Sequence, residues 1–142
     1  MGHICIREFR FEQDYDPVVR LWGNVGSGVH VGPSDAPAEL GKKLQRDPDL
    51  FLVAESNGAL VGTVIGGFDG RRGFIYHLAV DPAYRGQGIG THLMDEVEAR
   101  LRTKGCIRCY LLVLPDNDEA IRYYENHGWS LMTALPYAKD LV

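Results

Sequence analysis

The chain has little of what a secreted or membrane-spanning protein needs. Among its 142 residues are only three cysteines, an odd number that is too small for a disulfide framework. No apolar run approaches the roughly 20 residues that span a bilayer, and the segment Met1–Ile6 lacks the layout of a signal peptide. These absences predict a cytoplasmic protein that does not act on membranes.

An excess of basic charge is also missing. With 15 basic and 19 acidic side chains the net charge is -4, so the surface offers no broad basic field to nucleic acid. We therefore expect no nucleic-acid partner, and an anionic ligand would have to be held by local groups such as a helix N-terminus and a few arginines. The apolar share of 45% is ordinary for a globular protein, and the length predicts a single domain over residues 1–142.

The cysteines do not predict a metal site. Cys106 and Cys109 form a C-x-x-C pair, but no second pair is present to complete a zinc site. A redox role of this pair is one alternative. In the structural interpretation, Cys106 closes a turn between a helix and a strand, and Cys109 lies in that strand. The sequence therefore predicts no bound metal.

The hydrophobic pattern predicts alternating strands and helices without internal repeats. The predicted strands are residues 4–9, 50–55, 60–65, 74–80, 108–114 and 129–137. One predicted helix begins near Tyr15, two more cover 38–46 and 88–103, and a last one, capped by Asp116 or Asn117, ends near Asn126. Asn57-Gly58 is a favoured hairpin turn, and residues 69–73 make another. The order is β-α-α-β-β-β-α-β-α-β.

This order predicts an α/β (α+β) fold in which a mixed, mostly antiparallel sheet of about six or seven strands is flanked by about four helices. The helix 88–103 joins strands 74–80 and 108–114. These two strands should therefore be parallel, with a right-handed crossover.

A glycine-rich loop follows strand 74–80 and opens directly into the strongest predicted helix. Gly86, Gly88 and Gly90 lack a Cβ atom, so an anion can approach the backbone closely. The helix N-terminus directs amide groups and a positive dipole end toward that anion, and Arg85 adds a fork of donors. This arrangement predicts a cradle for a diphosphate group.

Other readings of the loop are weaker. A Walker A loop ends in Gly-Lys-Ser/Thr, whereas Gly90 is followed by Thr91 and His92. A dinucleotide fingerprint needs a third glycine where Thr91 stands, and too few residues follow for a full Rossmann domain. The glycines also have a purely structural interpretation, tight strand–helix packing, which explains one or two of them more easily than three on alternate positions after an arginine.

Two segments resemble the signatures of the GNAT superfamily of N-acetyltransferases. Residues 78–90, LAVDPAYRGQGIG, look like the central signature, whose core is Arg/Gln-x-x-Gly-x-Gly/Ala, and residues 117–129, NDEAIRYYENHGW, are similar to the second. Both occur in the right order, and the resemblance covers residues 51–129. Residues 51–55 and 66–73 further resemble the small bacterial YpeA-type members.

The resemblance implies that acetyl-CoA is the cosubstrate, without a metal, and that a primary amine attacks its thioester directly. In the family, the strand before the loop separates from its neighbour, and its free main-chain groups pair with the pantetheine arm. A backbone amide near Leu78 then faces the thioester oxygen. The coenzyme-binding positions carried over are Leu78, Ala79, Val80, Arg85, Gly86, Gln87, Gly88, Ile89, Gly90, Thr91 and Asn117.

The resemblance implies Tyr124 as the catalytic acid that assists departure of the thiolate, although core packing on an amphipathic helix is its structural interpretation. Many members carry a carboxylate on the strand before the loop as the base, and strand 74–80 has none. His77 has a suitable intrinsic pKa and is the candidate base. Tyr76 also lies on this strand, but strand alternation should send it to the opposite face. A structural histidine, water relays or an already neutral amine are the alternatives.

The acceptor amine would enter across the first two helices and the long loop between them. This region carries Trp22, His30 and Asp35, together with the acidic Glu39 and Asp47, which would suit a cationic amine. A solvated loop is an equally good interpretation for each residue taken singly.

Two further functions remain open on the same sequence. The first is a non-catalytic acyl-CoA sensor on the same fold, which would bind the coenzyme without turnover. The second is a nucleotide-binding fragment that prefers NAD or ATP to coenzyme A. An exposed edge strand is compatible with a homodimer, which the sequence leaves open.

Overall fold

The computed structural model describes residues 3–142, so Met1 and Gly2, which entered the signal-peptide argument, lie outside the described part. The chain divides into two compact units, the first ending at Leu112 and the second beginning at Val113. A single domain over the whole chain stays a prediction. None of the helices described between residues 3 and 142 is long and apolar enough to cross a membrane.

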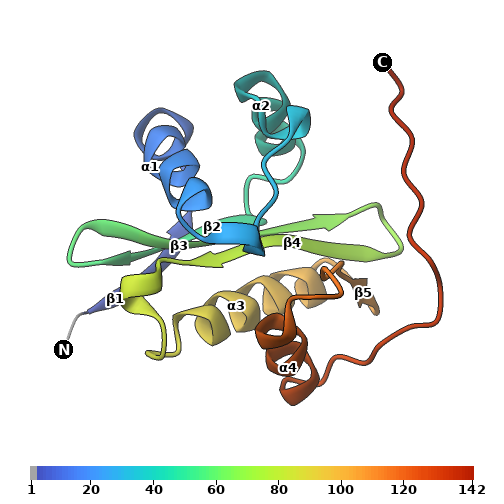
Figure 1. Ribbon diagram of the computed structural model, residues 1–142. Coiled ribbons are helices and arrows are strands. Elements are labelled where there is room, and N and C mark those ends of the chain that lie inside the picture. The colour runs from blue at the N-terminus through green and yellow to red at the C-terminus, as the bar shows by residue number, and fades with distance from the viewer. Residues whose placement is uncertain (1–2) are drawn as a thin grey trace. The chain divides into compact units, whose positions relative to one another are not determined.

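The first unit is built on a five-stranded sheet in the order β1-β2-β3-β4-β5 (Figure 1). The strands are β1 (Ile4–Glu8), β2 (Phe51–Ser56), β3 (Ala59–Phe68), β4 (Gly73–Val80) and β5 (Cys109–Tyr110). The pairs β1–β2, β2–β3 and β3–β4 are antiparallel, and the pair β4–β5 is parallel. The predicted fold class and the parallel pairing are confirmed.

Local turn chemistry sets the β2–β3 register. Asn57 and Gly58 have φ angles of 51° and 84°, the left-handed values that a two-residue hairpin turn requires. The pairing runs from Ser56↔Ala59 at the turn to Phe51↔Ile65 at the far end. The hairpin that the sequence predicts is therefore present.

Helices cover both faces of this sheet. α1 (Phe11–Gly23) and α2 (Pro37–Arg46) lie on one face, and α3 (Ile89–Thr103) lies on the other (Figure 1). Glycines of β3 let α3 pack closely, because a Cβ at Gly66 would stand 2.7 Å from Val97 Cγ2 and one at Gly62 would stand 3.0 Å from Leu93 Cδ1. This packing positions the N-terminus of α3.

The second unit contains α4 (Asp118–Asn126). Asn117 caps this helix, since its Oδ1 accepts a hydrogen bond of 3.2 Å from the Ala120 amide. The predicted strand 129–137 is not formed. Leu131 and Leu135 are 91% and 75% exposed, so this segment buries no apolar face that would stabilise a strand.

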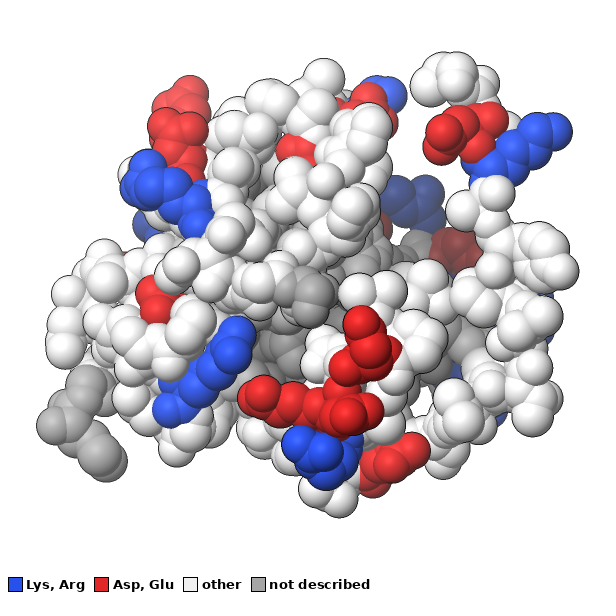
Figure 2. Space-filling model, viewed as in Figure 1, with Lys and Arg blue, Asp and Glu red and all other residues white. Residues whose placement is uncertain are grey.

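The expected strand number is therefore wrong, with five strands among the described residues instead of six or seven. The predicted strand 108–114 is also shorter, because only Cys109 and Tyr110 pair with β4. Figure 2 shows acidic and basic side chains interspersed on this face of the described residues, in keeping with the small net charge of -4.

Candidate functional site

The edge of β4 that faces β5 is largely unpaired. The two strands pair only at Gly73↔Cys109 and Phe74↔Tyr110, and β4 continues to Val80. Residues 111–114 that follow β5 are not in a strand. Main-chain groups of the second half of β4 are therefore open to an extended ligand, which can bind as an added strand.

A β-bulge interrupts β4 at the middle of this open edge. Thr63 pairs with Ala79 and Ile65 pairs with Tyr76, so His77 and Leu78 together stand opposite a single residue of β3. His77 has a φ of 54°, an uncommon value for a residue with a side chain. Such bulges redirect side chains and are frequent near active sites.

Buried hydrogen bonds hold the bulge in place. The Thr63 hydroxyl donates to the His77 carbonyl oxygen at 2.9 Å, and the Trp22 indole Nε1–H donates to Thr63 Oγ1 at 2.9 Å. Thr63 and Trp22 are 0% and 1% exposed. This connection ties β4 to β3 and α1, so the unusual backbone at His77 is maintained by groups shielded from water.

The bulge places the His77 ring against Asp35, which lies in the turn η2 (Pro33–Asp35). His77 Nε2 is 2.9 Å from Asp35 Oδ1 and 3.0 Å from Oδ2. The two side chains are 15% and 6% exposed. The sequence placed Asp35 only among several residues of the acceptor region and did not predict its contact with His77. The two residues are 42 positions apart, and no local pattern links them.

The expected alternation of Tyr76 and His77 is wrong, because the bulge breaks it. The ring centroids are 5.6 Å apart, with the rings near perpendicular. Burial, followed by the negative charges of Asp35 and Asp47, raises the pKa of Tyr76. Tyr76 therefore stays neutral at ordinary pH and is poorly suited to accept a proton.

Two of the three glycines in the glycine-rich loop have a left-handed backbone conformation. Gly86 and Gly88 both have a φ of 80°, in the left-handed region. Arg85 is exposed, and its Nε donates to the Val80 carbonyl oxygen at 3.2 Å, which holds the arginine against the end of β4. Gly90 differs from the other two glycines because it lies within α3.

The N-terminus of α3 opens from this loop. Gly88 is the N-cap residue, no side chain caps the helix, and its first turn carries no acidic residue. The His92 amide donates the first helical bond to the Gly88 carbonyl oxygen at 3.0 Å, so the amides of Ile89 and Gly90 have no acceptor within the helix. Anions are favoured at such a helix end.

Predicted site residues fall in both units. Leu78, Ala79 and Val80 lie on the open half of β4, and residues 85–91 form the loop and the first turn of α3, all in the first unit. Asn117 and Tyr124 belong to the second unit.

Tyr124 lies on α4 in an aromatic environment. Its ring centroid is 5.4 Å from that of Tyr123 and 6.0 Å from that of Trp129. Burial, with a smaller contribution from Tyr123, raises the pKa of Tyr124 to about 12. The phenol therefore keeps its proton at neutral pH and can donate a hydrogen bond.

The expected acceptor path is only partly acidic. Glu39 pairs with Lys42 at 2.8 Å, and Asp47 pairs with Lys43 at 3.0 Å. These two carboxylates are therefore offset by cations of the same helix, α2. His30 is exposed, whereas Trp22 is in the core.

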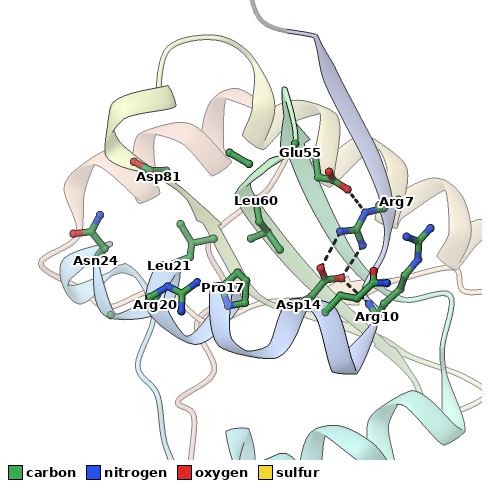
Figure 3. Close-up of a pocket in the computed structure, with 14 residues that line it drawn as sticks. Arg7, Arg10, Asp14, Pro17, Arg20, Leu21, Asn24, Glu55, Leu60 and Asp81 are labelled. Atoms are coloured by element: carbon green, nitrogen blue, oxygen red, sulfur yellow. Dashed lines mark hydrogen bonds and ion pairs between the residues drawn. The ribbon is translucent and has the colours of Figure 1, made fainter.

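A separate pocket of about 1040 Å³ opens beside α1, β1 and the β2–β3 turn (Figure 3). One end of its lining carries an ion pair in which Arg7 Nη1 and Nη2 donate to Asp14 at 2.7 and 2.9 Å, while Arg7 Nε contacts Glu55 (Figure 3). Burial alone would raise the pKa of Asp14, but hydrogen bonds from the Arg7 side chain and the Arg10 amide lower it overall. The lining includes none of the predicted site residues.

The C-x-x-C pair lies where the structural interpretation expects it, between α3 and β5. The two sulfur atoms are 3.9 Å apart beside Gly73, and Cys106 is buried. Burial, with the neighbouring Cys106, raises the pKa of Cys109 to about 12, so its thiol is weakly reactive. Among the described residues, no group of three or more His, Cys, Asp or Glu side chains could hold a metal.

Comparisons with known proteins agree with this geometry. A model of the acetyltransferase (GNAT) family matches residues 10–129. An acetyltransferase of Pectobacterium atrosepticum is 40% identical over 138 residues, which cover 96% of this chain and 95% of that protein. An acetyltransferase of Yersinia pseudotuberculosis is 38% identical over the same shares of the two chains.

Solved structures share the fold. Ard1 from Thermoplasma volcanium has a TM-score of 0.79 at 28% identity, covering 92% of this chain and 84% of that one. The PaiA N-acetyltransferase from Thermoplasma acidophilum, in complex with coenzyme A, has a TM-score of 0.79 at 21% identity. It covers 93% of this chain and 92% of its own.

Proposed function

Because the chain belongs to the GNAT acetyltransferase family and is an acyltransferase, we propose that it moves the acetyl group of acetyl-CoA to a primary amine. One observation carries the choice of cosubstrate. The unpaired edge of β4 leads directly to the left-handed glycines and the uncapped N-terminus of α3. An extended arm and a diphosphate joined to it match these two features in the same order.

The residues of the first unit fit this ligand. Main-chain groups of Leu78 to Val80 would hold the pantetheine arm, and Gly86 to Gly90 with Arg85 would hold the diphosphate. Acetyl-CoA supplies an activated acyl group when it is bound. By analogy with the family, a backbone amide near Leu78, within the bulge of β4, would stabilise the developing oxyanion, an effect worth about 3–4 kcal/mol.

Two side chains handle protons and charge in this proposal. His77 accepts the proton that the amine loses, since its ring is the imidazole on the bulge of β4. Tyr124 donates a hydrogen bond to the departing thiolate. Full proton transfer from Tyr124 is unfavourable because its pKa of about 12 lies far above the value of about 8.5 for a thiol.

The proposal also covers the cellular location, the acceptor and the oligomeric state. We place the protein in the cytoplasm, with a small-molecule or protein amine as acceptor. A homodimer through the sheet edge would involve β1, which is an outer strand of the described sheet.

Thermal unfolding with acetyl-CoA, NAD and ATP tests the cosubstrate. At a hundredfold excess over Kd, acetyl-CoA should add about 2.7 kcal/mol to the free energy of unfolding and raise Tm by about 5–10 °C. NAD and ATP should leave Tm unchanged. Equal shifts with NAD or ATP, or no shift with acetyl-CoA, would contradict the cradle.

Turnover then separates an enzyme from an acyl-CoA sensor. Release of free thiol from acetyl-CoA is measured with a panel of amines: a peptide with a free N-terminus, a lysine peptide, a polyamine, an aminoglycoside and a small amino metabolite. Thiol release with one class supports the transferase. Tight binding of acetyl-CoA without thiol release on any of them would favour the sensor.

Replacing Tyr124 with phenylalanine should lower kcat by about tenfold or more while the Kd of acetyl-CoA changes less than about twofold. The reason is that the phenol acts on charge that develops only as the C–S bond breaks. Tyr123→Phe on the same helix is the matched control and should keep kcat. An unchanged kcat for Tyr124→Phe would remove this residue from the mechanism.

A further inference from the structure

We infer that Asp35 is a positioning residue, which holds the His77 ring in the tautomer with its proton on Nε2 and so presents Nδ1 to the acceptor amine. The inference deepens the proposed function, because it assigns the atom that receives the proton and the group that keeps this atom unprotonated beforehand.

The contact between Asp35 and His77 fixes which ring nitrogen carries the hydrogen. Both carboxylate oxygens of Asp35 lie within 3.0 Å of His77 Nε2. An ionised carboxylate only accepts hydrogen bonds, so Nε2 must carry the hydrogen. In the neutral ring, the other nitrogen, Nδ1, then has the free lone pair.

The second ring nitrogen of His77, Nδ1, is not engaged by the described part of the protein. Nε2 is the only ring nitrogen of His77 with a hydrogen-bond partner among the described residues. No buried side-chain nitrogen or oxygen in this part of the chain lacks a partner. Nδ1 is therefore not sealed in the core and keeps contact with solvent, on a side chain that is 15% exposed.

Asp35 is buried and held by its own turn. Its side chain is 6% exposed, and its Oδ2 accepts a hydrogen bond of 3.1 Å from the Gly32 amide. The Ala36 amide closes the same turn by donating to the Pro33 carbonyl oxygen at 3.2 Å. The carboxylate is thus held by its own backbone turn, as a group that orients another side chain needs to be.

Aromatic side chains pack against the His77 ring. The centroid of the Trp22 ring is 4.7 Å from that of His77, with the planes 70° apart, and the Tyr76 ring packs near perpendicular on another side. Together with the Thr63 bond to the His77 carbonyl oxygen, these contacts fix the ring between the helices and the sheet. Asp35 then selects the nitrogen that is left free.

This arrangement accounts for the proton that the amine loses during acetyl transfer. The proton that the acceptor amine loses forms a bond to His77 Nδ1, and the imidazolium that results is stabilised by the Asp35 carboxylate. Because Nδ1 reaches solvent, the proton returns from there to water after each turnover. No oxidant, reductant or additional reactant is required.

Nitrogen-15 NMR of the imidazole rings in the full chain, without any ligand, tests the inference directly. When its His77 ring is neutral, the unmodified chain should carry the ring proton on Nε2. Asp35→Ser removes the carboxylate from the ring but keeps a short acceptor for the Gly32 amide, and it should give a mixture of the two tautomers. Asp14→Asn, which alters a buried carboxylate paired with Arg7 instead, should leave the His77 tautomer unchanged.

Kinetics adds a second readout, with the panel amine that gives the highest turnover. Asp35→Ser should lower kcat by about tenfold at an unchanged KM for acetyl-CoA. In a His77→Gln background, Asp35→Ser should change kcat by less than about twofold, because the residue acts through the ring. A further large loss in that background would overturn the inference.

The NMR result is independent of the proposed function. A proton on Nδ1 in the unmodified chain, or an unchanged tautomer in Asp35→Ser, would overturn the role of Asp35 even if the protein transfers acetyl groups. Conversely, absence of turnover on every amine would count against the transferase, while the tautomer measurement would still decide whether Asp35 orients His77.

Discussion

Gly88→Leu is expected to weaken the binding of acetyl-CoA by at least about 100-fold, measured by titration calorimetry. Gly88 has a φ of 80° and is the N-cap of α3, so a side chain here favours a different backbone angle and turns the first amides of the helix away from the diphosphate. A Cβ at this position would meet only His92 Cδ2, at 3.8 Å. The effect therefore comes from the backbone and from bulk in the cradle, not from a clash in the core.

Gly105→Leu is the matched control at the other end of the same helix. Gly105 has a φ of 92°, and a Cβ there would meet nothing within 4 Å. Both substitutions cost about 1–2 kcal/mol of backbone strain, but only Gly88 lies at the N-terminus. Equal affinity for acetyl-CoA in the two variants would show that the loop is a tight turn and not a binding site.

The second large effect is expected at His77. His77→Gln should lower kcat by about 100- to 1000-fold, while the Kd of acetyl-CoA stays within about threefold. In the proposed mechanism, the imidazole receives a proton during the reaction, whereas the main-chain groups of β4 hold the coenzyme. Thiol release at saturating acetyl-CoA measures kcat, and added imidazole should restore part of the activity of His77→Ala.

Tyr76→Phe is the control for this prediction, because it retains the ring that packs on His77 and removes only the hydroxyl. Tyr76 stays neutral because burial, Asp35 and Asp47 raise its pKa. Removal of its hydroxyl should therefore leave kcat within about twofold. A His77→Gln variant with full kcat would mean that water, or an amine that is already neutral, removes the need for a base. A large loss in Tyr76→Phe with a normal His77→Gln would assign the base to Tyr76.

The bulge of β4 links these expectations to the fold. Because one strand carries an additional residue opposite Val64, Tyr76 and His77 no longer alternate, and the His77 ring can reach Asp35. The same interruption lies along the part of β4 that has no β5 partner. The proposed base and the proposed oxyanion donor therefore lie at one irregularity of strand pairing, beside the edge proposed to bind the coenzyme.

Much of the fold follows from local patterns that the sequence displays. The Asn57-Gly58 turn, the helical spacing of Ile89, Leu93 and Val97, and the cap at Asn117 each depend on neighbouring residues, and each is present. The glycine loop before α3 was equally readable, because left-handed glycines and a helix N-terminus are encoded by adjacent positions. Periodicity could not show that residues 129–137 form no strand, since pairing requires a partner elsewhere in the chain.

The sequence by itself determined the family, the order of the main elements and the position of the glycine loop, because short-range spacing and turn chemistry encode them. Only the tertiary structure decided that β4 and β5 separate after Phe74↔Tyr110, and that the bulge turns His77 toward Asp35. The physical reason is that both results depend on contacts between distant segments. His77 and Asp35 are 42 positions apart, and their pairing arises only when η2 packs beside the bulge of β4.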